Sequence, residues 1–207
     1  DKLEIIIVDD GSQDESPDII QTFMPKTKKI SCFRLDPHKK IKSGKAGAIL
    51  SGIEKSGGEF IFITDADCAV PPTWLKGLLA AFDAQTGIAG GFTLGFRRLT
   101  VFQKMQNIDL LYLLSVASST SAFDKPTSWV GNNIAIRRQA YDSIGGYAAL
   151  EDSLVEDFAL IAALDKQTRW KSCFCPSPQT VVKSSPPKVL KEWYNQRKRW
   201  ACGIPHM

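Results

Sequence analysis

The stretch from Glu59 to Cys68 reads Glu-Phe-Ile-Phe-Ile-Thr-Asp-Ala-Asp-Cys, an apolar run that leads into two acids. Phe60 to Thr64 is short, β-branched and aromatic, which is typical of a buried strand. The strand would end on Asp65 and Asp67, and a Pro-Pro pair soon stops regular structure. Two carboxylates this close repel each other unless a divalent cation lies beside them. The motif alone fits a metal site or a capped turn equally well.

In the sequence around this stretch, expected strands alternate with expected helices. In the first part of the chain we expect strands over 3–8, 29–35 and 59–64 and helices over 16–23 and 46–55. This β-α-β-α-β order with short connections predicts a parallel sheet with helices on both faces. Asp9 and Asp10 follow the first strand, so they would lie at the same sheet edge as Asp65.

The second half of the chain contains both the 3.6-residue hydrophobic period of helices and the two-residue period of strands. We expect helices over 73–82, 101–117, 137–144, 151–164 and 188–200, and extended segments over 87–96, 129–136 and 173–182. Residues 118–128 are small and polar, which predicts a mobile loop.

Length and composition limit the function classes. The 207 residues suffice for one domain with a sizeable core, and the net charge of +4 permits an anionic ligand without demanding nucleic acid. Five cysteines are an odd number without metal-finger spacing, which favours free thiols in a reducing compartment. No apolar run approaches the length of a membrane span.

Two groups in the first half could bind a nucleotide. Asp9 and Asp10 precede a Gly turn, where carboxylates can accept hydrogen bonds from a base or a ribose, although turn capping is the simpler explanation. Lys45 lies among glycines at an expected helix start, which suits a phosphate. A solvated basic loop is the alternative, and the spacing is not that of a Walker loop.

Three groups in the second half could serve a sugar. Gly131 and Asn132 lie between an aromatic residue and a strand, where amides can bind hydroxyls, but this pattern alone is unspecific. Glu156 and Asp157 begin a helix, whose dipole stabilises acids there. A carboxylate in a pocket is also the simplest general base for a sugar hydroxyl.

The last group lies on the final expected helix. Gln196, Arg199 and Trp200 are three and four residues apart and share a face, with Trp193 beside them. An amide, a guanidinium and an indole suit a sugar ring and a phosphate. A basic amphipathic helix on a membrane surface explains the same residues, and the two interpretations are compatible.

Together the motifs resemble the family 2 glycosyltransferases, especially the membrane-bound branch that includes cellulose, chitin and hyaluronan synthases. The segments that carry the resemblance are 6–12, 45–48, 65–67, 131–147, 156–157 and 196–200. The resemblance implies an α/β fold of the GT-A (Rossmann-like) type, with a mixed, mostly parallel central sheet flanked by helices. It also implies that residues 1–207 form a single catalytic domain.

The resemblance implies roles for the residues of the donor site. Asp9 or Asp10 would contact the uridine, and Lys45 would lie near the nucleotide. Asp65 would contact the nucleotide and share the metal with Asp67, which would hold Mg²⁺ or Mn²⁺ against the diphosphate.

It also implies an inverting transfer from a nucleotide-diphosphate sugar, expected to be a UDP-sugar, to a saccharide or lipid acceptor. Asp157 would be the base that takes the proton of the acceptor hydroxyl. The acceptor and the diphosphate would be bound by Gly131, Asn132, Glu156, Gln196, Arg199 and Trp200.

Departures from the family pattern add further expectations. The family usually has one more strand ahead of position 1 and often continues into membrane helices, so we expect a soluble fragment of a protein anchored at the cytoplasmic face of the cell membrane. Val155 replaces a usual Thr, and Val130-Gly131-Asn132 replaces a usual Thr-Gly-Thr, which bears on donor or acceptor preference.

Three other functions fit parts of the pattern. A sugar nucleotidyltransferase would need a Gly-rich basic signature near its amino end, and the chain has none there. A phosphate-receiver domain would not need the last hundred residues. A non-catalytic nucleotide-sugar-binding module would keep the fold without turnover, although Asp67, Asp157 and Arg199 are all present.

Overall fold

The computed structural model describes residues 3–36, 42, 44–96, 100–126, 129–150 and 156–203. Its strands are β1 (Ile5–Asp9), β2 (Ile30–Arg34), β3 (Phe60–Ile63), β4 (Thr86–Gly91), β5 (Thr93–Gly95), β6 (Ile134–Arg137), β7 (Lys171–Cys175) and β8 (Val182–Ser184). Its α-helices are α1 (Ser16–Phe23), α2 (Gly44–Glu54), α3 (Trp74–Leu79), α4 (Val101–Ala122), α5 (Arg138–Ser143), α6 (Gly146–Ala149), α7 (Glu156–Gln167) and α8 (Leu190–Gly203). Two 3₁₀ turns, η1 (Met24–Lys26) and η2 (Pro178–Thr180), complete the list.

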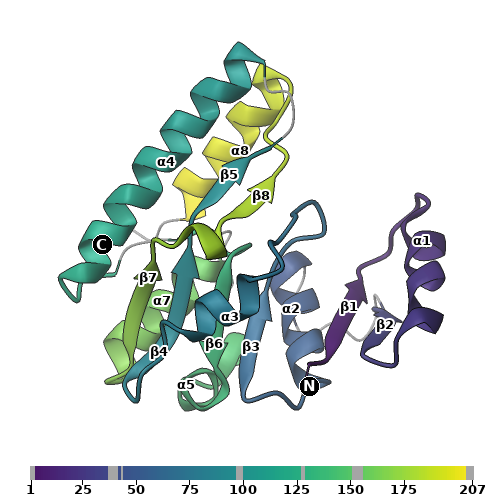
Figure 1. Cartoon of the computed structure of the whole chain (residues 1–207), viewed down its shortest axis with the longest axis horizontal. Coiled ribbons are helices and arrows are strands. Elements are labelled where there is room, and N and C mark those ends of the chain that lie inside the picture. The colour runs from purple at the N-terminus through teal and green to yellow at the C-terminus, as the bar shows by residue number, and fades with distance from the viewer. Residues whose placement is uncertain are drawn as a thin grey trace.

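A four-stranded mixed sheet in the order β3-β6-β4-β7 forms the centre of the fold (Figure 1). Strand β6 is antiparallel to both β3 and β4, while β4 is parallel to β7. Strands β3, β4 and β7 therefore point the same way, and their carboxyl ends share one edge with the amino end of β6. We call this edge the site edge.

The expected parallel run of the first three strands is wrong at its third member. Strand β1 pairs in parallel with β2, but β3 takes the antiparallel β6 as its described partner. The expected strand over 87–96 is also two strands, because β4 joins the central sheet and β5 pairs with β8. The α/β class and the mixed central sheet are confirmed: three of its four strands point the same way, although two of its three pairings, both made by β6, are antiparallel.

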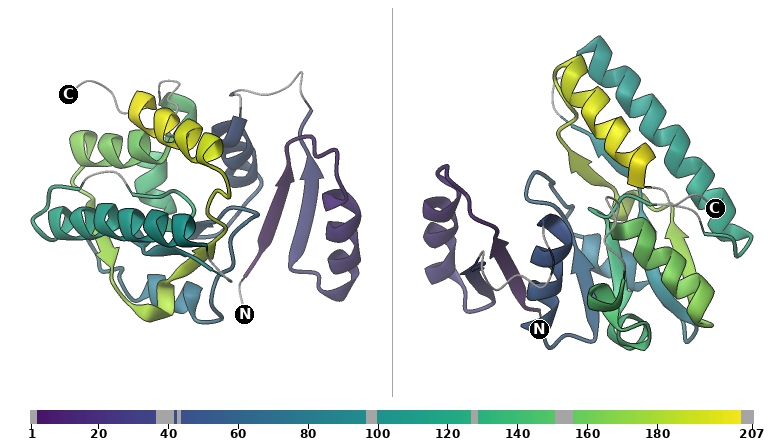
Figure 2. Two further views of the ribbon diagram at one scale, coloured as in Figure 1. Left: turned by 90° about the horizontal axis from the view of Figure 1, so that it is seen from above. Right: turned by 180° about the vertical axis from the view of Figure 1, so that it is seen from behind.

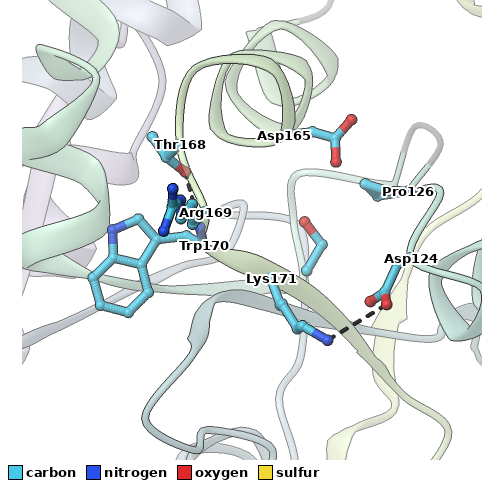
Figure 3. Close-up of a pocket in the computed structure, with 8 residues that line it drawn as sticks. Asp124, Pro126, Asp165, Thr168, Arg169, Trp170 and Lys171 are labelled. Atoms are coloured by element: carbon cyan, nitrogen blue, oxygen red, sulfur yellow. Dashed lines mark hydrogen bonds and ion pairs between the residues drawn. The ribbon is translucent and has the colours of Figure 1, made fainter.

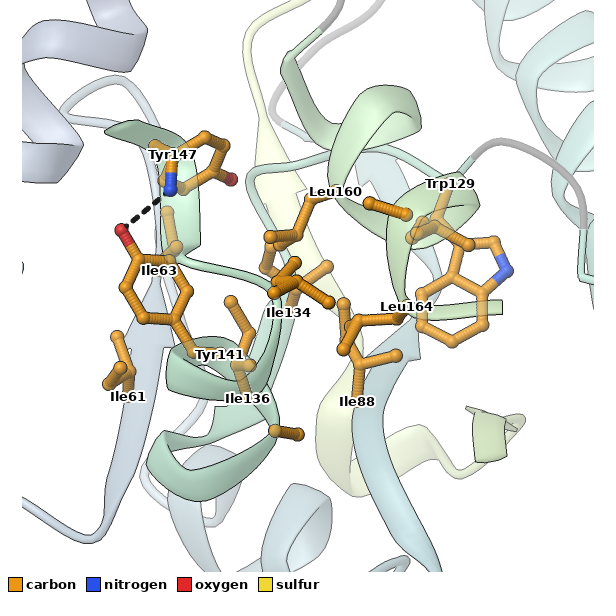
Figure 4. Close-up of a cluster of buried hydrophobic side chains, with 14 of the residues drawn as sticks. Ile61, Ile63, Ile88, Trp129, Ile134, Ile136, Tyr141, Tyr147, Leu160 and Leu164 are labelled. Atoms are coloured by element: carbon orange, nitrogen blue, oxygen red, sulfur yellow. Dashed lines mark hydrogen bonds between the residues drawn. The ribbon is translucent and has the colours of Figure 1, made fainter. Parts of the chain in front are cut away.

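Alternating side chains of β6 fill two cores, one on each face of the sheet. Ile134 and Ile136 point into the larger cluster, which α5, α6 and α7 cover, while Ala135 points into the smaller one beneath α3. In the larger cluster Leu160 and Leu164 of α7 are fully buried. Figure 4 shows how these side chains gather against the sheet, and how the Tyr141 hydroxyl accepts a hydrogen bond of 2.9 Å from the Tyr147 amide.

The β1–β2 pair with α1 lies to one side of the central sheet (Figure 2). Helix α2 joins the two parts, since it contacts β1 and contributes Leu50 and Ile53 to the large core. Glu4 adds a polar contact, because its Oε1 accepts hydrogen bonds of 2.7 and 3.0 Å from the amides of Gly57 and Gly58. No residue of α1 is buried.

Helix α8 and the first half of α4 project together beyond the site edge, while the second half of α4 packs beside β7, and we call the two helices the arm (Figures 1 and 2). Thr100 and Gln103 form a capping box at the start of α4. The loop expected over 118–128 is wrong up to Ala122, because α4 continues that far with Ala117 and Ser121 buried, while residues 127 and 128 lie outside the described chain. The hydroxyls of Ser115 and Ser119 donate to the carbonyls of Leu111 and Ser115, one turn earlier, which satisfies them inside the helix.

Candidate active site

The site edge collects residues from two distant parts of the sequence. In the β3–β6 ladder Ile63 pairs with Ile134. The residues that follow Ile63 therefore meet those that precede Ile134 at the end of the ladder. This places the Asp65 segment next to Gly131 and Asn132, as expected for a single site.

Asp65 and Asp67 lie in the tight turn that ends β3. The amide of Cys68 donates a hydrogen bond of 3.0 Å to the carbonyl of Asp65, which closes the turn. Asp67 is exposed, and Asp65 is about one-third exposed. Lys45, in the first turn of α2, places its Nζ 2.7 Å from Oδ1 of Asp65. The structure thus joins two residues that the sequence suggested separately.

The same turn offers three metal-ligand atoms. Oxygens of Asp65 and Asp67 and the Sγ of Cys68 all lie within 4.8 Å of one another. Burial, followed by the charges of Asp67 and Asp65, raises the pKa of the Cys68 thiol to about 11, so the thiol keeps its proton at neutral pH. Two carboxylates fit a hard cation such as Mg²⁺ or Mn²⁺. Cys68 was missed, although it directly follows the acid pair in the sequence.

Asp157 is nearly buried at the start of α7, and its carboxylate is held in place from two sides. Its Oδ2 accepts a 2.5 Å hydrogen bond from the Gly131 amide, and its Oδ1 accepts one of 3.0 Å from the Phe158 amide. A Cβ on Gly131 would lie 2.7 Å from that Oδ2, so only glycine allows this approach. Glu156 begins the helix, but its side chain lies outside the described structure.

The two asparagines before β6 are buried and bonded inside the protein. Asn132 accepts a hydrogen bond of 2.8 Å from the Thr93 hydroxyl. Asn133 accepts one of 2.8 Å from the Trp74 indole and donates to the carbonyls of Phe92 and Thr180 at 2.8 and 2.9 Å. The expected strand over 129–136 therefore starts only at Ile134. The two amide side chains connect the preceding turn to neighbouring segments by these hydrogen bonds.

Asp9 ends β1 and caps the turn that follows. Its Oδ1 accepts hydrogen bonds from the amides of Ser12 at 2.8 Å and Gly11 at 3.2 Å, and Gly11 has a φ of +95°. The bonds from Ser12, with help from the Arg34 guanidinium and the Gly11 amide, hold the pKa of Asp9 below its usual value. Asp10 is exposed beside it. The capping interpretation thus describes Asp9, while Asp10 faces solvent.

The α8 residues lie in the arm, where they contact α4. Arg197 is 2.6 Å from Asp109 of α4 and stacks between the rings of Trp193 and Trp200, at 5.8 and 4.6 Å from their centroids. Gln196 and Trp200 are half-buried, and Arg199 is exposed. In the described part of the chain, the side-chain bonds of α8 run to Asp109 of α4 and to the amide of Lys188, two residues before the helix begins. Sequence reasoning did not single out Arg197, although it lies between Trp193 and Trp200, which the sequence pattern placed on one face.

A separate hollow of about 230 Å³ lies at the opposite end of β7 (Figure 3). Lys171 crosses it to reach Asp124 at 3.4 Å. It is lined by Asp124, Pro126, Asp165, Thr168, Arg169, Trp170, Lys171 and Ser172. None of the predicted site residues lines it, since the amino end of β7 is at the far edge of the sheet.

Comparison with known proteins agrees with this arrangement. A probable glycosyltransferase, YdaM of Bacillus subtilis, is 29% identical over 98% of this chain and 48% of its own length. A β-monoglucosyldiacylglycerol synthase of Synechocystis is 25% identical over 98% of the chain and 41% of its own length. The chain thus spans about half the length of the curated relatives it matches.

A solved structure has the same fold. The mannosyltransferase PcManGT of Pyrobaculum calidifontis, in complex with GDP-Man and Mn²⁺, aligns with a TM-score of 0.68 and 20% identity over 97% of this chain and 52% of its own. The family model for glycosyl transferase family 2 matches residues 1–156, which include the acid pair, Lys45 and Gly131. The chain therefore belongs to glycosyl transferase family 2.

Proposed function

We propose that this chain is the catalytic domain of an inverting, metal-assisted glycosyltransferase that uses a nucleotide-diphosphate sugar. The observation that carries the proposal is the meeting of three groups at the site edge: the Asp65–Asp67 turn, Lys45 bonded to it, and Asp157 fixed on Gly131. Acids for a cation, a lysine for phosphate and an oriented carboxylate are the parts that sugar transfer needs.

The acid turn would hold the donor. Asp67, with Asp65, would hold Mg²⁺ or Mn²⁺, and the bound ion would neutralise charge on the departing diphosphate. Lys45 would add a second positive charge to the same phosphates. Asp9 and Asp10, on the neighbouring β1–β2 pair, would contact the uridine of a UDP-sugar. The Mn²⁺ and GDP-Man complex of the structurally similar mannosyltransferase supports a nucleotide-sugar and metal site in this fold.

Asp157 would act as the general base. Each carboxylate oxygen has two lone pairs, so the bonds from Gly131 and Phe158 leave capacity to accept the proton of an acceptor hydroxyl. The acceptor oxygen would then attack the anomeric carbon from the face opposite the diphosphate. The bond from that carbon to the diphosphate would break, with inversion at the anomeric centre.

The acceptor would be a saccharide or a lipid hydroxyl. The Synechocystis relative is a glucosyldiacylglycerol synthase by name, which supports a lipid acceptor, and the same chemistry serves a growing saccharide. Gly131, Asn132, Glu156, Gln196, Arg199 and Trp200 would bind the acceptor and the diphosphate. Such a reaction would take place at the cytoplasmic face of the membrane, where nucleotide sugars meet lipid-linked acceptors.

The Asp157→Asn variant tests the base. An amide keeps the shape and the hydrogen bond to Gly131 but cannot take a proton, so we expect transfer to fall about 10³-fold. Binding of UDP with Mn²⁺ should stay unchanged. Asp165→Asn, an exposed acid on the same helix, is the matched control and should keep full activity. Full activity in Asp157→Asn would reject the assignment.

Calorimetric titration of UDP, with and without Mn²⁺, tests the donor site. We expect metal-dependent binding that Asp67→Ala abolishes, while Asp142→Ala, at an exposed acid on α5, leaves it intact. Binding without transfer to any acceptor would instead favour the non-catalytic binding module. UDP binding that is the same with and without Mn²⁺ would contradict the proposal that Asp67 holds the metal.

A further inference from the structure

The turn that ends β3 has a cysteine directly after its second acid. The Sγ of Cys68 donates a hydrogen bond of 3.5 Å to Oδ1 of Asp67, and a carboxylate oxygen of Asp65 lies within 4.8 Å of the ligand atoms of both. Among the described residues, no other group of three His, Cys, Asp or Glu side chains brings its ligand atoms so close together. We call Asp65, Asp67 and Cys68 the ligand triad.

The backbone and the smaller core hold the cysteine of the triad in place. The amide of Cys68 closes the turn on the carbonyl of Asp65, and the next residue, Ala69, exchanges hydrogen bonds of 2.7 and 2.9 Å with Lys183 of β8. The Cys68 side chain also packs against the smaller core beneath α3. A ligand atom that is already fixed in this way loses little freedom when a metal ion binds.

Packing alone does not explain where the sulfur of this cysteine lies. Free cysteines often serve as small apolar fillers. Cys175 of β7 packs against the same smaller core, and its Sγ meets the carbonyl of Gly77 at 3.9 Å. The Sγ of Cys68 instead meets the carboxylate of Asp67 at the site edge. The two cysteines therefore share a core but differ in what their sulfurs can bind.

The spacing of the triad fits a small tetrahedral cation. A zinc ion lies about 2.0 Å from a carboxylate oxygen and about 2.3 Å from a thiolate sulfur, so two such ligand atoms are about 3.5 Å apart. The Cys68 Sγ and the Asp67 Oδ1 have this separation, at 3.5 Å. Asp65 keeps capacity for the ion, since Lys45 contacts one of its two oxygens and a carboxylate has about four lone-pair sites.

Sulfur changes which cations the turn prefers. Carboxylate oxygens suit hard ions such as Mg²⁺ and Mn²⁺, whereas a thiolate selects softer ions such as Zn²⁺. We propose that Cys68 makes the acid turn a binding site for thiophilic divalent cations, with Zn²⁺ bound by Asp65, Asp67 and the Cys68 thiolate. The ion replaces the thiol proton, which goes to solvent.

The consequence for catalysis rests on the proposed function. Zn²⁺ in the triad would use the carboxylates that are proposed for Mg²⁺ or Mn²⁺, so the two classes of ion would compete for one place. Three anionic ligands more than cancel the charge of Zn²⁺, so a departing diphosphate would gain little from it. Zn²⁺ would therefore inhibit sugar transfer, and an excess of Mn²⁺ would relieve the inhibition.

Titration with Cd²⁺, a thiophilic probe with an ultraviolet thiolate-to-metal absorption band, tests the site in the chain of residues 1–207. We expect the band to saturate at one equivalent, and Zn²⁺ to displace it while about a hundredfold excess of Mg²⁺ does not. Cys68→Ser should abolish this band. It should also lower the affinity for Zn²⁺ about 100-fold, the upper end of what the loss of a supporting partner costs a metal site, and change the affinity for Mn²⁺ far less.

Matched variants separate the triad from a lone thiol. Cys175→Ser removes the other cysteine of the smaller core and should keep the band. Asp67→Asn keeps the Cys68 thiol but removes a carboxylate, so it should weaken Cd²⁺ binding about tenfold or more, which a lone thiol would not show. Circular dichroism of each variant should match that of the unchanged protein.

Three results would overturn the proposal: no band in the unchanged protein, a band that persists in Cys68→Ser, or Cd²⁺ binding by Asp67→Asn that is as tight as before. Because Asp67→Asn retains the cysteine, it tests the triad even if Cys68→Ser does not fold. These titrations need no nucleotide. A failure to bind UDP would therefore reject the proposed donor site and leave the triad to be judged by the Cd²⁺ band.

Discussion

The central sheet and the β1–β2 pair both present acids at strand ends, but they are supported very differently. Every residue of β4 is buried, and Ile134, Ala135 and Ile136 of β6 are at most 1% exposed. In the β1–β2 pair only Asp9 is buried, while Ile5 is 41% exposed. The sheet is stabilised by its own two cores, whereas the pair depends on α2 and on the Glu4 contacts.

We infer from this difference that the two halves of the candidate site differ in local stability. Local opening is easiest where few apolar side chains are buried. The proposed base and metal turn belong to the rigid part, while the acids proposed for the nucleoside belong to the part that opens more easily. Donor binding should therefore order the β1–β2 pair more than the sheet.

Asn133→Ala should give the largest effect. The substitution removes three hydrogen bonds and leaves the Trp74 N–H and the Thr180 carbonyl buried without this partner, although the Phe92 carbonyl keeps its bond from the Val182 amide; the loss should cost about 4 kcal/mol of unfolding free energy. Ile5→Ala in β1 should cost only about 1 kcal/mol, because that side chain is already partly in water. Urea unfolding of both variants measures the contrast, and equal losses would contradict it.

Gly131→Ala should come next, at about 2 kcal/mol. The new methyl would lie 2.7 Å from the Asp157 Oδ2 and 2.9 Å from its Cβ, so the carboxylate must move. We expect transfer to be lost while UDP and Mn²⁺ still bind, since the change is on the sheet side of the site. Gly57→Ala, where a Cβ meets nothing within 4 Å, is the control. Loss of UDP binding in Gly131→Ala would show that the two sides are not separable.

Sequence reasoning placed the candidate residues better than it placed the strand pairing. Asp65, Lys45 and Asp157 lie at a strand end or a helix start, as expected, while the roles given to them stay predictions. The antiparallel place of β6 could not be predicted, since a four-residue apolar strand looks the same in either direction. The length of α4 was also underestimated, because serines within it resemble a loop until their hydroxyls bond back to the helix and Ala117 is buried.

The reaction rates of two cysteines compare how often the two regions open locally, and this effect should be smaller than those of the substitutions above. Cys32 of β2 and Cys173 of β7 are both half-buried free thiols, and burial raises the pKa of each. In single-cysteine variants under native conditions, Cys32 should react with a disulfide reagent about tenfold faster, since the β1–β2 pair opens more often. UDP with Mn²⁺ should slow Cys32 more than Cys173. Equal rates would mean that the two regions open together.

The smallest effect should be a pH dependence confined to each region. Asp9 and Asp83 cap similar turns, because Asp83 Oδ1 accepts hydrogen bonds of 2.8 Å from the amides of Gln85 and Thr86 and from the Thr86 hydroxyl. The bond from the Thr86 hydroxyl, followed by those from the Gln85 and Thr86 amides, holds the pKa of Asp83 below its usual value, as the bonds from Ser12 do for Asp9. A lowered pKa in the folded state gives stability that is present above the unfolded value and is lost as the pH falls through the folded one.

Amide hydrogen exchange between pH 5 and pH 2.5, corrected for intrinsic rates, should report the loss of stability in each of the two regions separately. As the pH falls below about 3.8, protection should drop first in β1 and β2, which have little else to hold them. Asp9→Asn should remove that dependence from β1 and β2 alone, and Asp83→Asn should change only the start of β4. A simultaneous loss across both regions would mean that the β1–β2 pair has no stability separate from the central sheet, because one cooperative unit would then carry both caps.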